Sequence, residues 1–338
     1  MATLGNTVLT LTDWAKRLDP DGKTSMIVEI LSQTNEILED MMMKEGNLPT
    51  GEQVTIRTGL PDVFYRLINA GVPKSKSTTA QITEPTSILE ARSEVDVDEA
   101  KLNGNTNEYR LSESEAFLEA MNQRQADTMI YGSNANPEEY VGLANRYNDL
   151  SAPNGQNILD AGGTGSDNSS IWLVGWGQRT VHGIFPKGSN VGLDHEDLGI
   201  QDAFDSNNDR FRAYMDRYVW KHGLVVKDWR YAVRIANIDI SDLVGLTGTQ
   251  DPTASTSITK LMSRAIDRMP SLNNISPAFY ANRTVLSHLR VLAQERSNNV
   301  LSIEPGFNQF GENIFTLRFL GIPVRLVDRL TETETQVV

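Results

Sequence analysis

The sequence contains no cysteine among its 338 residues. It therefore cannot form disulfides, bind a metal through thiolates or use a thiolate nucleophile, and it is suited to a reducing cytoplasm. Histidine is scarce as well, and no serine or carboxylate lies at a motif spacing from the four that are present, His182, His195, His222 and His288. We interpret each of these histidines as a packing or surface residue.

Long apolar runs and a basic leader are also missing. Residues 1–7 have neither the basic nor the apolar part of an export signal, and no run approaches the roughly 20 apolar residues that cross a bilayer. Lysine and arginine number 31 against 44 aspartates and glutamates, which gives a net charge of −13. We therefore expect neither a membrane partner nor a general phosphate-binding surface.

The chain is longer than one core usually requires, so we expect two or more compact regions joined by extended pieces. Residues 1–50 are predicted to form an N-terminal arm with a helix, which Thr24 or Ser25 caps and which ends at Gly46. The apolar residues of this helix fall on one face: Met26, Ile27, Ile30, Leu31, Ile37, Leu38 and Met41.

Residues 51–102 are predicted to form an extended β-hairpin loop. The outgoing leg contains two strand patterns, Val54–Thr58 and Val63–Asn69, a flexible tip follows at Gly71–Thr79, and Ile82–Val97 returns. An isolated hairpin is only marginally stable in water. This loop therefore needs a surface to lie on, either on its own subunit or on the next one.

A helix from Ser112 to Gly132 is predicted next, within a peripheral region at residues 103–145. Ser112 and Glu115 have the spacing of a capping box, and Gly132 can end the helix. Its apolar side would consist of Phe117, Leu118, Met121 and Met129.

Residues 146–325 alternate strand and helix patterns, which indicates an α+β domain with helices beside a sheet. Its predicted strands include Ile171–Val174, Thr180–Phe185, Tyr214–Trp220, Leu224–Asn237 and Ser276–Tyr280. Two amphipathic helices are expected, one from Ile258 to Met269 and one that Asn282 caps.

The end of the chain joins a strand at Asn313–Leu320 to a second at Val324–Asp328 through a turn at Gly321–Pro323. The polar tail, residues 326–338, contains Thr331-Glu-Thr-Glu-Thr335, which we expect no core to bury. Deleting Thr333–Val338 should therefore leave the subunit folded.

This ordered series resembles the major capsid proteins of tailed double-stranded-DNA bacteriophages, which have the Hong Kong ninety-seven-like fold. The run His222–Asp239, the Gly-Ile-Pro-Val turn ending at Val324 and the Thr/Glu tail carry the resemblance. It implies an N-terminal arm, an extended loop reaching adjacent subunits, a spine helix in a peripheral domain, and an axial domain. It also implies a structural protein that assembles as pentamers and hexamers into an icosahedral head enclosing double-stranded DNA.

The resemblance also implies partners and contact residues. The chain would contact itself, portal and scaffolding proteins, a decoration or cement protein and, non-specifically, packaged DNA, in a virion assembled in the host cytoplasm. The inter-subunit contact candidates are Phe64, Tyr65, Leu67, Ile68, Lys74 and Lys76. Some relatives join a loop lysine to an asparagine of a neighbour, for which Asn298 and Asn299 are candidate acceptors, but we favour solvated lysines.

Motifs for chemistry are incomplete. The glycine-rich stretch Asp160–Asn168 lacks the features of a phosphate loop, and Asp205–Asp209 lacks the glycine and glutamate of a calcium loop. Asp194-His-Glu-Asp197 is predicted to be a loop without metal-binding geometry. We therefore predict no catalytic residue, cofactor or metal site, and no enzyme. Two alternatives remain open: an encapsulin-type compartment shell, and a soluble metal-dependent hydrolase that uses the Asp194–Asp197 loop.

Overall fold

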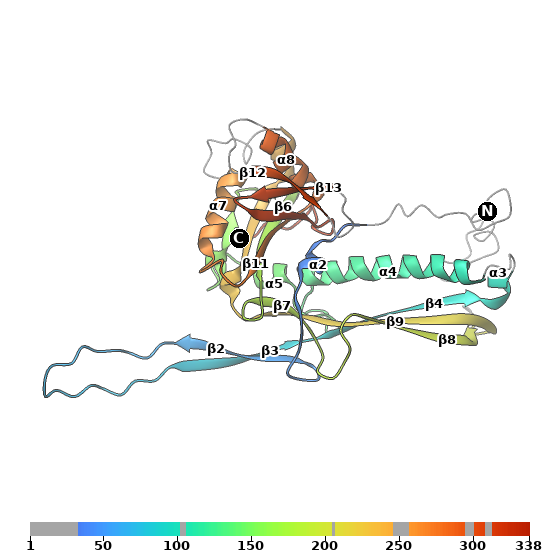
Figure 1. Ribbon diagram of the computed structural model, residues 1–338, viewed down its shortest axis with the longest axis horizontal. Coiled ribbons are helices and arrows are strands. Elements are labelled where there is room, and N and C mark those ends of the chain that lie inside the picture. The colour runs from blue at the N-terminus through green and yellow to red at the C-terminus, as the bar shows by residue number, and fades with distance from the viewer. Residues whose placement is uncertain (1–32, 102–105, 205–206, 246–256, 295–300, 308–312) are drawn as a thin grey trace.

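The computed structural model describes residues 33–101, 106–204, 207–245, 257–294, 301–307 and 313–338. Figure 1 shows three parts: a globular axial part, an arm in which one long helix lies along a narrow sheet, and a hairpin that projects away from both. Within the described residues no helix is long and apolar enough to cross a bilayer. The mixture of helices and sheet confirms the predicted α+β class.

The axial sheet is built around β6 (Asn168–Trp176). β10 (Ala232–Asp239) pairs antiparallel with one edge of β6, and β11 (Ser276–Ala281) pairs antiparallel with the other. The remaining strands extend this sheet: β5 (Ile158–Asp160) beside β10, then β14 (Ile322–Leu326), β13 (Asn313–Phe319) and β12 (Leu301–Phe307) beyond β11.

Both faces of the axial sheet are covered. Ile171 and Leu173 of β6 pack in the cluster that contains α7 (Ile258–Arg268) and α8 (Arg283–Gln294). Trp172 and Val174 point to the opposite face, where the end of the long helix, α5 (Leu143–Arg146) and the C-terminal segment pack. Successive strand residues alternate between faces, so this continuous apolar run is buried on both sides.

The helices and last strands of the axial part follow the sequence closely. The Asn282 side chain accepts a hydrogen bond from the Val285 amide at 2.8 Å, which confirms the predicted cap of α8. Leu317 and Phe319 of β13 are buried in one cluster with Leu286 and Leu289 of α8. Gly321 adopts the positive φ, +83°, that the turn before β14 requires.

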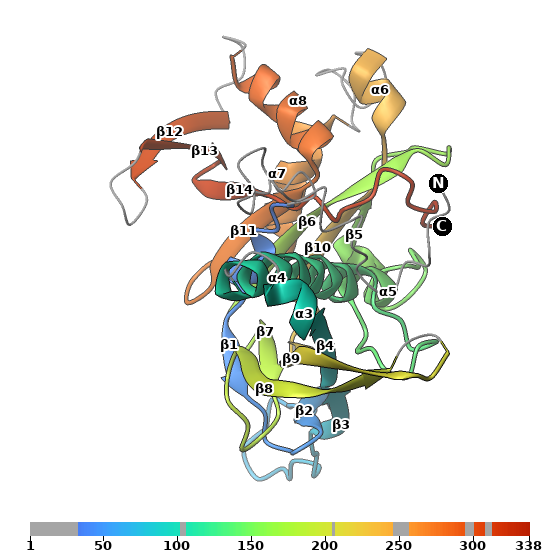
Figure 2. The same cartoon turned by 90° about the vertical axis from the view of Figure 1, so that its right-hand side faces the viewer.

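The peripheral arm consists of α4 (Thr106–Tyr131) lying over β4 (Ser87–Asp96), β9 (Arg210–Val226) and β8 (Leu193–Phe204), as Figures 1 and 2 show. The predicted capping box is wrong. Ser112 lies inside the helix and its hydroxyl donates to the Tyr109 carbonyl at 2.9 Å, so it cannot cap. The predicted end at Gly132 is confirmed, since the helix stops at Tyr131.

The apolar side of α4 differs in part from the prediction. Met121 and Met129 are buried, but Leu118 is exposed, and Phe117 is half-buried against Tyr218. Only the second half of α4 reaches the axial core, and there Met129 and Ile130 pack with Tyr140 and Leu143. Among the described residues, the first half of α4 packs on the narrow sheet, with Phe117 stacked on Tyr218 of β9.

The hairpin is formed by β2 (Gly51–Gly59) and β3 (Thr78–Pro85), paired from Gly51 opposite Pro85 to Gly59 opposite Thr78. The predicted strand at Val63–Asn69 is wrong: residues 60–77 form an irregular tip. Its returning leg contains Pro73, which has no amide hydrogen to donate to a partner strand. After Thr86 the chain leaves the hairpin, because β4 pairs with β9, and Val97–Lys101 forms α3.

The first part of the predicted helix, residues 24–32, lies outside the described residues. Within them, α2 (Ile37–Asp40) is a single turn, and Met41 is extended. β1 (Met43–Glu45) then pairs parallel with β7 (Val181–Phe185), so the chain enters the axial sheet where a longer helix was expected. The backbone bonds to β7 explain why the helical pattern does not continue through Met43.

The prediction of an unburied C-terminal tail is wrong. Glu334 and Val337 are buried, with 6% and 5% of their surfaces exposed. The tail lies against the axial sheet, where Val337 packs in the cluster of Trp172 and Tyr147. An acidic, threonine-rich pattern hid this burial because the matching cation, Arg234, is far away in the sequence.

Candidate functional site at the projecting hairpin

The tip of the hairpin, residues 60–77, exposes large apolar side chains. Tyr65 and Ile68 are fully or nearly fully exposed, at 109% and 90% of their reference surfaces. The other exposed apolar residues of the tip are Leu60, Val63, Phe64, Leu67 and Val72. Exposed apolar side chains gathered on one projecting segment are typical of a docking surface. Four of the predicted contact residues, Phe64, Tyr65, Leu67 and Ile68, therefore lie together at the tip.

The tip is also basic within an acidic chain. Within residues 60–77 the charged side chains are Arg66, Lys74 and Lys76 against Asp62, so the charge of the tip is 3 − 1 = +2 in a chain of −13. Lys74 and Lys76 are exposed and form no ion pair with any described residue. The proposed acceptors Asn298 and Asn299 lie outside the described residues. The tip therefore combines apolar surface with positive charge.

The root of the hairpin is held by buried ion pairs. Glu52 and Glu84 lie directly opposite each other across β2 and β3. Arg146 of α5 binds both carboxylate oxygens of Glu84, at 2.6 and 2.7 Å. Glu52 accepts from Lys227 at 2.7 Å and lies 3.0 Å from the His182 ring. Each carboxylate thus has its own cation, which offsets the repulsion between neighbouring like charges.

The electrostatics of the root favour a charged Glu52. Burial alone raises the pKa of Glu52, but the hydrogen bonds from Lys227 and His182 outweigh burial and hold that pKa below its ordinary value. Burial lowers the pKa of His182 although Glu52 opposes this effect. Gly51 begins β2 at φ +156°, and a Cβ at this position would lie 2.0 Å from the Glu84 carbonyl oxygen. The root therefore fixes the direction in which the tip projects.

No local signal in the sequence identifies the root. Arg146 is separated from Glu84 by 62 residues, and His182 from Glu52 by 130. Alternation along a strand shows that glutamates share a face, but it does not show which cations reach them. The root residues were therefore missed, whereas the apolar tip was found from composition alone.

The acidic segment Asp194–Asp197 is part of strand β8, and the prediction of a loop is wrong. His195 Nε2 lies 3.0 Å from the Asp216 carboxylate, and Arg110 bridges Asp216 and Asp197 at 2.9 and 3.0 Å. Because Arg110 occupies these carboxylates, the cluster joins α4 to β8 and β9. Among the described residues no group of three or more acidic or histidine side chains is placed to hold a metal; Asp205 of the other acidic candidate lies outside those residues.

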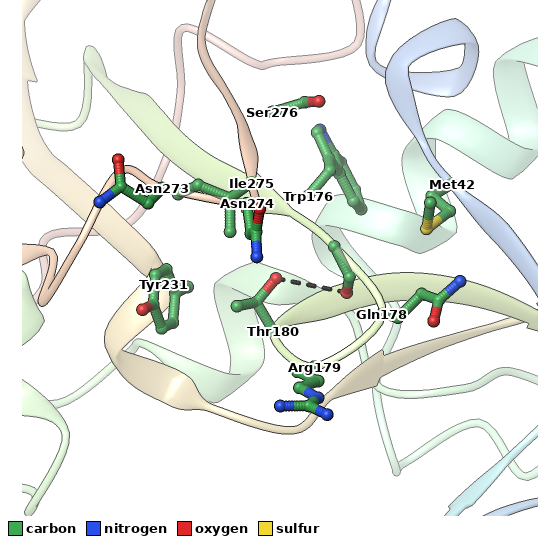
Figure 3. A pocket seen from close by; sticks show the side chains of 11 residues that line it. Met42, Trp176, Gln178, Arg179, Thr180, Tyr231, Asn273, Asn274, Ile275 and Ser276 are labelled. Carbon is green, nitrogen blue, oxygen red and sulfur yellow. Dashed lines mark hydrogen bonds between the residues drawn. The ribbon is translucent and has the colours of Figure 1, made fainter.

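An open depression of about 640 Å³ lies between the turn at Gly177–Thr180 and the loop at Asn273–Ser276, as Figure 3 shows. The Thr180 hydroxyl donates to the Gly177 carbonyl at 3.3 Å and stiffens this turn. Amide side chains, Arg179 and Tyr231 line the depression, but none of the described lining residues is a carboxylate or a histidine. It therefore offers no acid–base pair of the kind that a hydrolase needs.

Comparison with protein families gives one match: the family described as "Major capsid protein GP7" matches residues 19–338. Among solved structures, a chain of bacteriophage Epsilon15 is 32% identical, with a TM-score of 0.77, and the match covers 100% of this chain and 99% of that one. A search of curated proteins finds no match.

More distant structures are also similar to this chain. The capsid of bacteriophage JBD30 gives 11% identity, a TM-score of 0.48, and coverage of 91% of this chain and 96% of that one. The SrpI encapsulin of Synechococcus elongatus PCC 7942 gives 12% identity, a TM-score of 0.42, and coverage of 68% and 97%. We draw no argument from likeness at this level.

Proposed function

Since the chain belongs to the family of the major capsid protein GP7, it is a structural protein of a tailed-phage virion, and we propose that its projecting hairpin joins neighbouring copies in the shell. The observation that carries this proposal is the contrast within the hairpin, whose root is fixed by buried ion pairs, while Tyr65, Leu67 and Ile68 of its tip are at least 80% exposed in the part of the chain that the structure describes. A rigidly aimed apolar surface is suited to docking because little order is lost on binding.

The proposed contact is heterologous: the tip of one copy lies on a different surface of the next copy. Such contacts close into rings when the rotation between copies allows closure. We propose pentamers and hexamers of this kind, assembled into an icosahedral shell. Phe64, Tyr65, Leu67 and Ile68 would supply the apolar contact, and Lys74 and Lys76 would remain solvated or face acidic groups of the neighbour.

We keep the division of the chain as a proposal: residues 1–50 as the N-terminal arm, 51–102 as the extended loop, 103–145 as the peripheral region with its spine helix, 146–325 as the axial domain, and 326–338 as the tail. The peripheral region also takes in β4 from the loop range and β8 with the paired part of β9 from the axial range. Portal and scaffolding proteins, a decoration or cement protein, and packaged double-stranded DNA are proposed partners. The DNA contact would be non-specific, because the chain is acidic overall.

The two alternatives have less support. The 32% identity to the bacteriophage Epsilon15 chain, over the whole length of both, favours a phage shell over an encapsulin-type compartment. The hydrolase alternative depended on Asp194–Asp197 as an available loop. Arg110 and the pairing of β8 with β9 engage that segment in structural contacts. We accordingly propose that the protein has no catalytic activity.

A length-preserving change at the tip tests the proposal. In this variant Phe64, Tyr65, Leu67 and Ile68 are all replaced by Ser, and the matched control is Ser77→Ala in the same tip. We expect the variant subunit to retain its circular dichroism spectrum and thermal midpoint but to form no shells by negative-stain microscopy. The control should form normal shells. Normal shells from the fourfold variant would contradict the proposed role of the tip.

A further inference from the structure

Glu334 is the most completely engaged residue of the C-terminal segment Thr331–Val338. Its carboxylate accepts from Arg234 at 2.8 Å and from the Tyr131 hydroxyl at 2.6 Å, and the Ser170 hydroxyl donates to it as well. The Arg234 and Glu334 side chains are only 5% and 4% exposed. Arg234 has no other carboxylate partner among the described residues, so Glu334 alone neutralises this buried cation.

A second anchor lies three residues further along, at Val337. Asn237 donates from its side-chain amide to the Val337 carbonyl at 2.9 Å and accepts from the Val337 amide at 2.8 Å. Asn237 has a positive φ of +58° and lies where the pairing of β10 with β6 shifts register. A non-glycine residue in this conformation is costly unless its surroundings hold it there. At this irregularity in β10 the Asn237 side-chain amide donates both to the Val337 carbonyl and to the Asp160 carboxylate, the latter at 2.8 Å.

The tail itself has almost no structure of its own. It forms an isolated β-bridge, in which the Glu334 amide donates to the Asn168 carbonyl at 2.9 Å, and no regular strand. Between the two anchors, Thr335 and Gln336 are exposed. The segment therefore lies on the axial part as an extended peptide would lie in a binding groove, with alternate parts buried.

The surrounding groups are arranged to receive an anion followed by an apolar side chain. Besides Glu334, the Arg234 guanidinium bonds to the Ser170 hydroxyl and the Tyr147 carbonyl and lies 5.3 Å from the Trp172 ring centre. These contacts keep the guanidinium in place without neutralising it. Burial and the nearby carboxylate raise the pKa of Tyr131, which keeps its hydroxyl protonated as a donor.

From these contacts we propose that the axial part contains a peptide-binding site for the pattern Glu-x-x-Val, which Thr331–Val338 occupies as a tethered ligand. Arg234, Ser170 and Tyr131 recognise the glutamate, and Asn237 together with the Trp172 cluster recognises the valine. Because Tyr131 ends α4 whereas Arg234 belongs to the axial sheet, the ligand also fixes the spine helix to the axial part. The site is separate from the hairpin and does not depend on the assembly role proposed for it.

The experiment uses the full chain, with a flexible linker carrying a protease site inserted between Thr331 and Glu332, both of which are exposed. The folded protein is cleaved, and exchange of the freed segment with a fluorescent Thr331–Val338 peptide is followed by anisotropy. We expect the cleaved subunit to stay folded and the labelled peptide to bind to it saturably. Peptides carrying Glu334→Gln or Val337→Ser should bind at least about tenfold more weakly.

The matched control is a Glu332→Gln peptide, which loses the same charge at an exposed position; the Glu332 carboxylate accepts from Thr284 and Asn282, an amide oxygen can accept the same bonds, and this peptide should bind within about threefold of the parent peptide. Equal binding of the Glu334→Gln and Glu332→Gln peptides would overturn the proposed recognition. Aggregation of the subunit on cleavage, or a freed segment that excess peptide cannot displace even in mild urea, would show that the tail is an inseparable part of the core. Either result would also overturn the proposal.

Discussion

The hairpin and the C-terminal tail are both extended segments, yet they relate to the subunit in opposite ways. The hairpin pairs its own two legs, so the backbone groups that face each other are hydrogen-bonded within it, and its apolar tip stands in solvent. Within the tail, Thr331–Val338 forms a single isolated β-bridge, at Glu334, and is otherwise held mainly by side chains of the rest of the subunit. Self-paired strands can project, whereas an unpaired strand must be bound.

From the sequence alone the tail is expected to be solvated, because its composition is polar, although Glu334 and Val337 are buried in the structure. Thr331–Thr335 is polar and acidic, which is typical of a solvated end. The Glu334 carboxylate can be buried because Arg234 lies beside it and neutralises its charge. In the hairpin tip, by contrast, apolar residues are exposed on the described subunit, as the proposed contact with a neighbouring copy requires.

The largest stability effect is expected in the tail. Glu334→Ala should lower the free energy of unfolding by about 3–5 kcal/mol, because it leaves the buried Arg234 without a counter-charge. Glu332→Ala, an equal truncation at an exposed position, should lower it by no more than about 1 kcal/mol. Urea unfolding of both variants measures the difference. If the two losses were equal, the tail would not differ energetically from a solvated segment.

A second prediction concerns pH and the place where β9 passes from the peripheral sheet into the axial sheet. His222 is buried there between Tyr140 and Trp220, and neither ring nitrogen has a hydrogen-bond partner among the described residues. Burial lowers the pKa of His222 to about 4. In the unfolded chain the pKa is about 6.5, so protonation favours unfolding.

The pH window follows from these two values. Above about pH 6.5 His222 is neutral in both the folded and the unfolded chain, and its burial does not make the free energy of unfolding depend on pH. As the pH decreases from 6.5 toward 4, the unfolded chain takes up a proton at His222 while the folded chain does not, and the free energy of unfolding falls by about 3 kcal/mol in total. His222→Phe, which keeps an aromatic ring between the same neighbours, should remove this part of the pH dependence. Unfolding curves at pH 7, 5.5 and 4.5 for both proteins provide the test, and parallel losses of stability would contradict the assignment to His222.

Substitutions at the root of the hairpin should lower the free energy of unfolding, as those at Glu334 in the tail do and those at the tip do not. Arg146→Ala leaves the Glu84 carboxylate without its two charged hydrogen bonds and should cost about 2–3 kcal/mol of unfolding free energy. Arg92→Ala removes an exposed arginine whose pair with Glu90 is solvated, and it should cost less than about 1 kcal/mol. Similar costs for both would show that the root does not fix the hairpin.

The smallest stability effect is expected at the tip. Leu67→Ser or Ile68→Ser should change the unfolding free energy of the isolated subunit by less than about 0.5 kcal/mol, because these side chains are already 80% and 90% exposed in the folded subunit. Thermal unfolding of unassembled subunits is the measurement. A loss above about 2 kcal/mol would mean that the tip packs within its own subunit.

Local patterns were sufficient for much of the fold. Alternation and capping predict β6, β11, α7 and α8 because those signals lie within a few residues of one another. They fail where a distant partner decides the outcome, as when β7 draws Met43–Glu45 into a strand or when Glu334 meets Arg234. For the same reason the exposed tip of the hairpin could be predicted and the cations at its root could not.

The contrast between tip and tail can be measured directly in a chain that has no cysteine. Single cysteines are introduced as Tyr65→Cys at the tip and Val337→Cys in the tail, and maleimide labelling rates are compared between unassembled subunits and purified shells. We predict rapid labelling at position 65 in subunits and strong protection in shells, with protection at position 337 in both states. Equally rapid labelling of position 65 in subunits and shells would contradict the claim that the hairpin tip is the contact between copies.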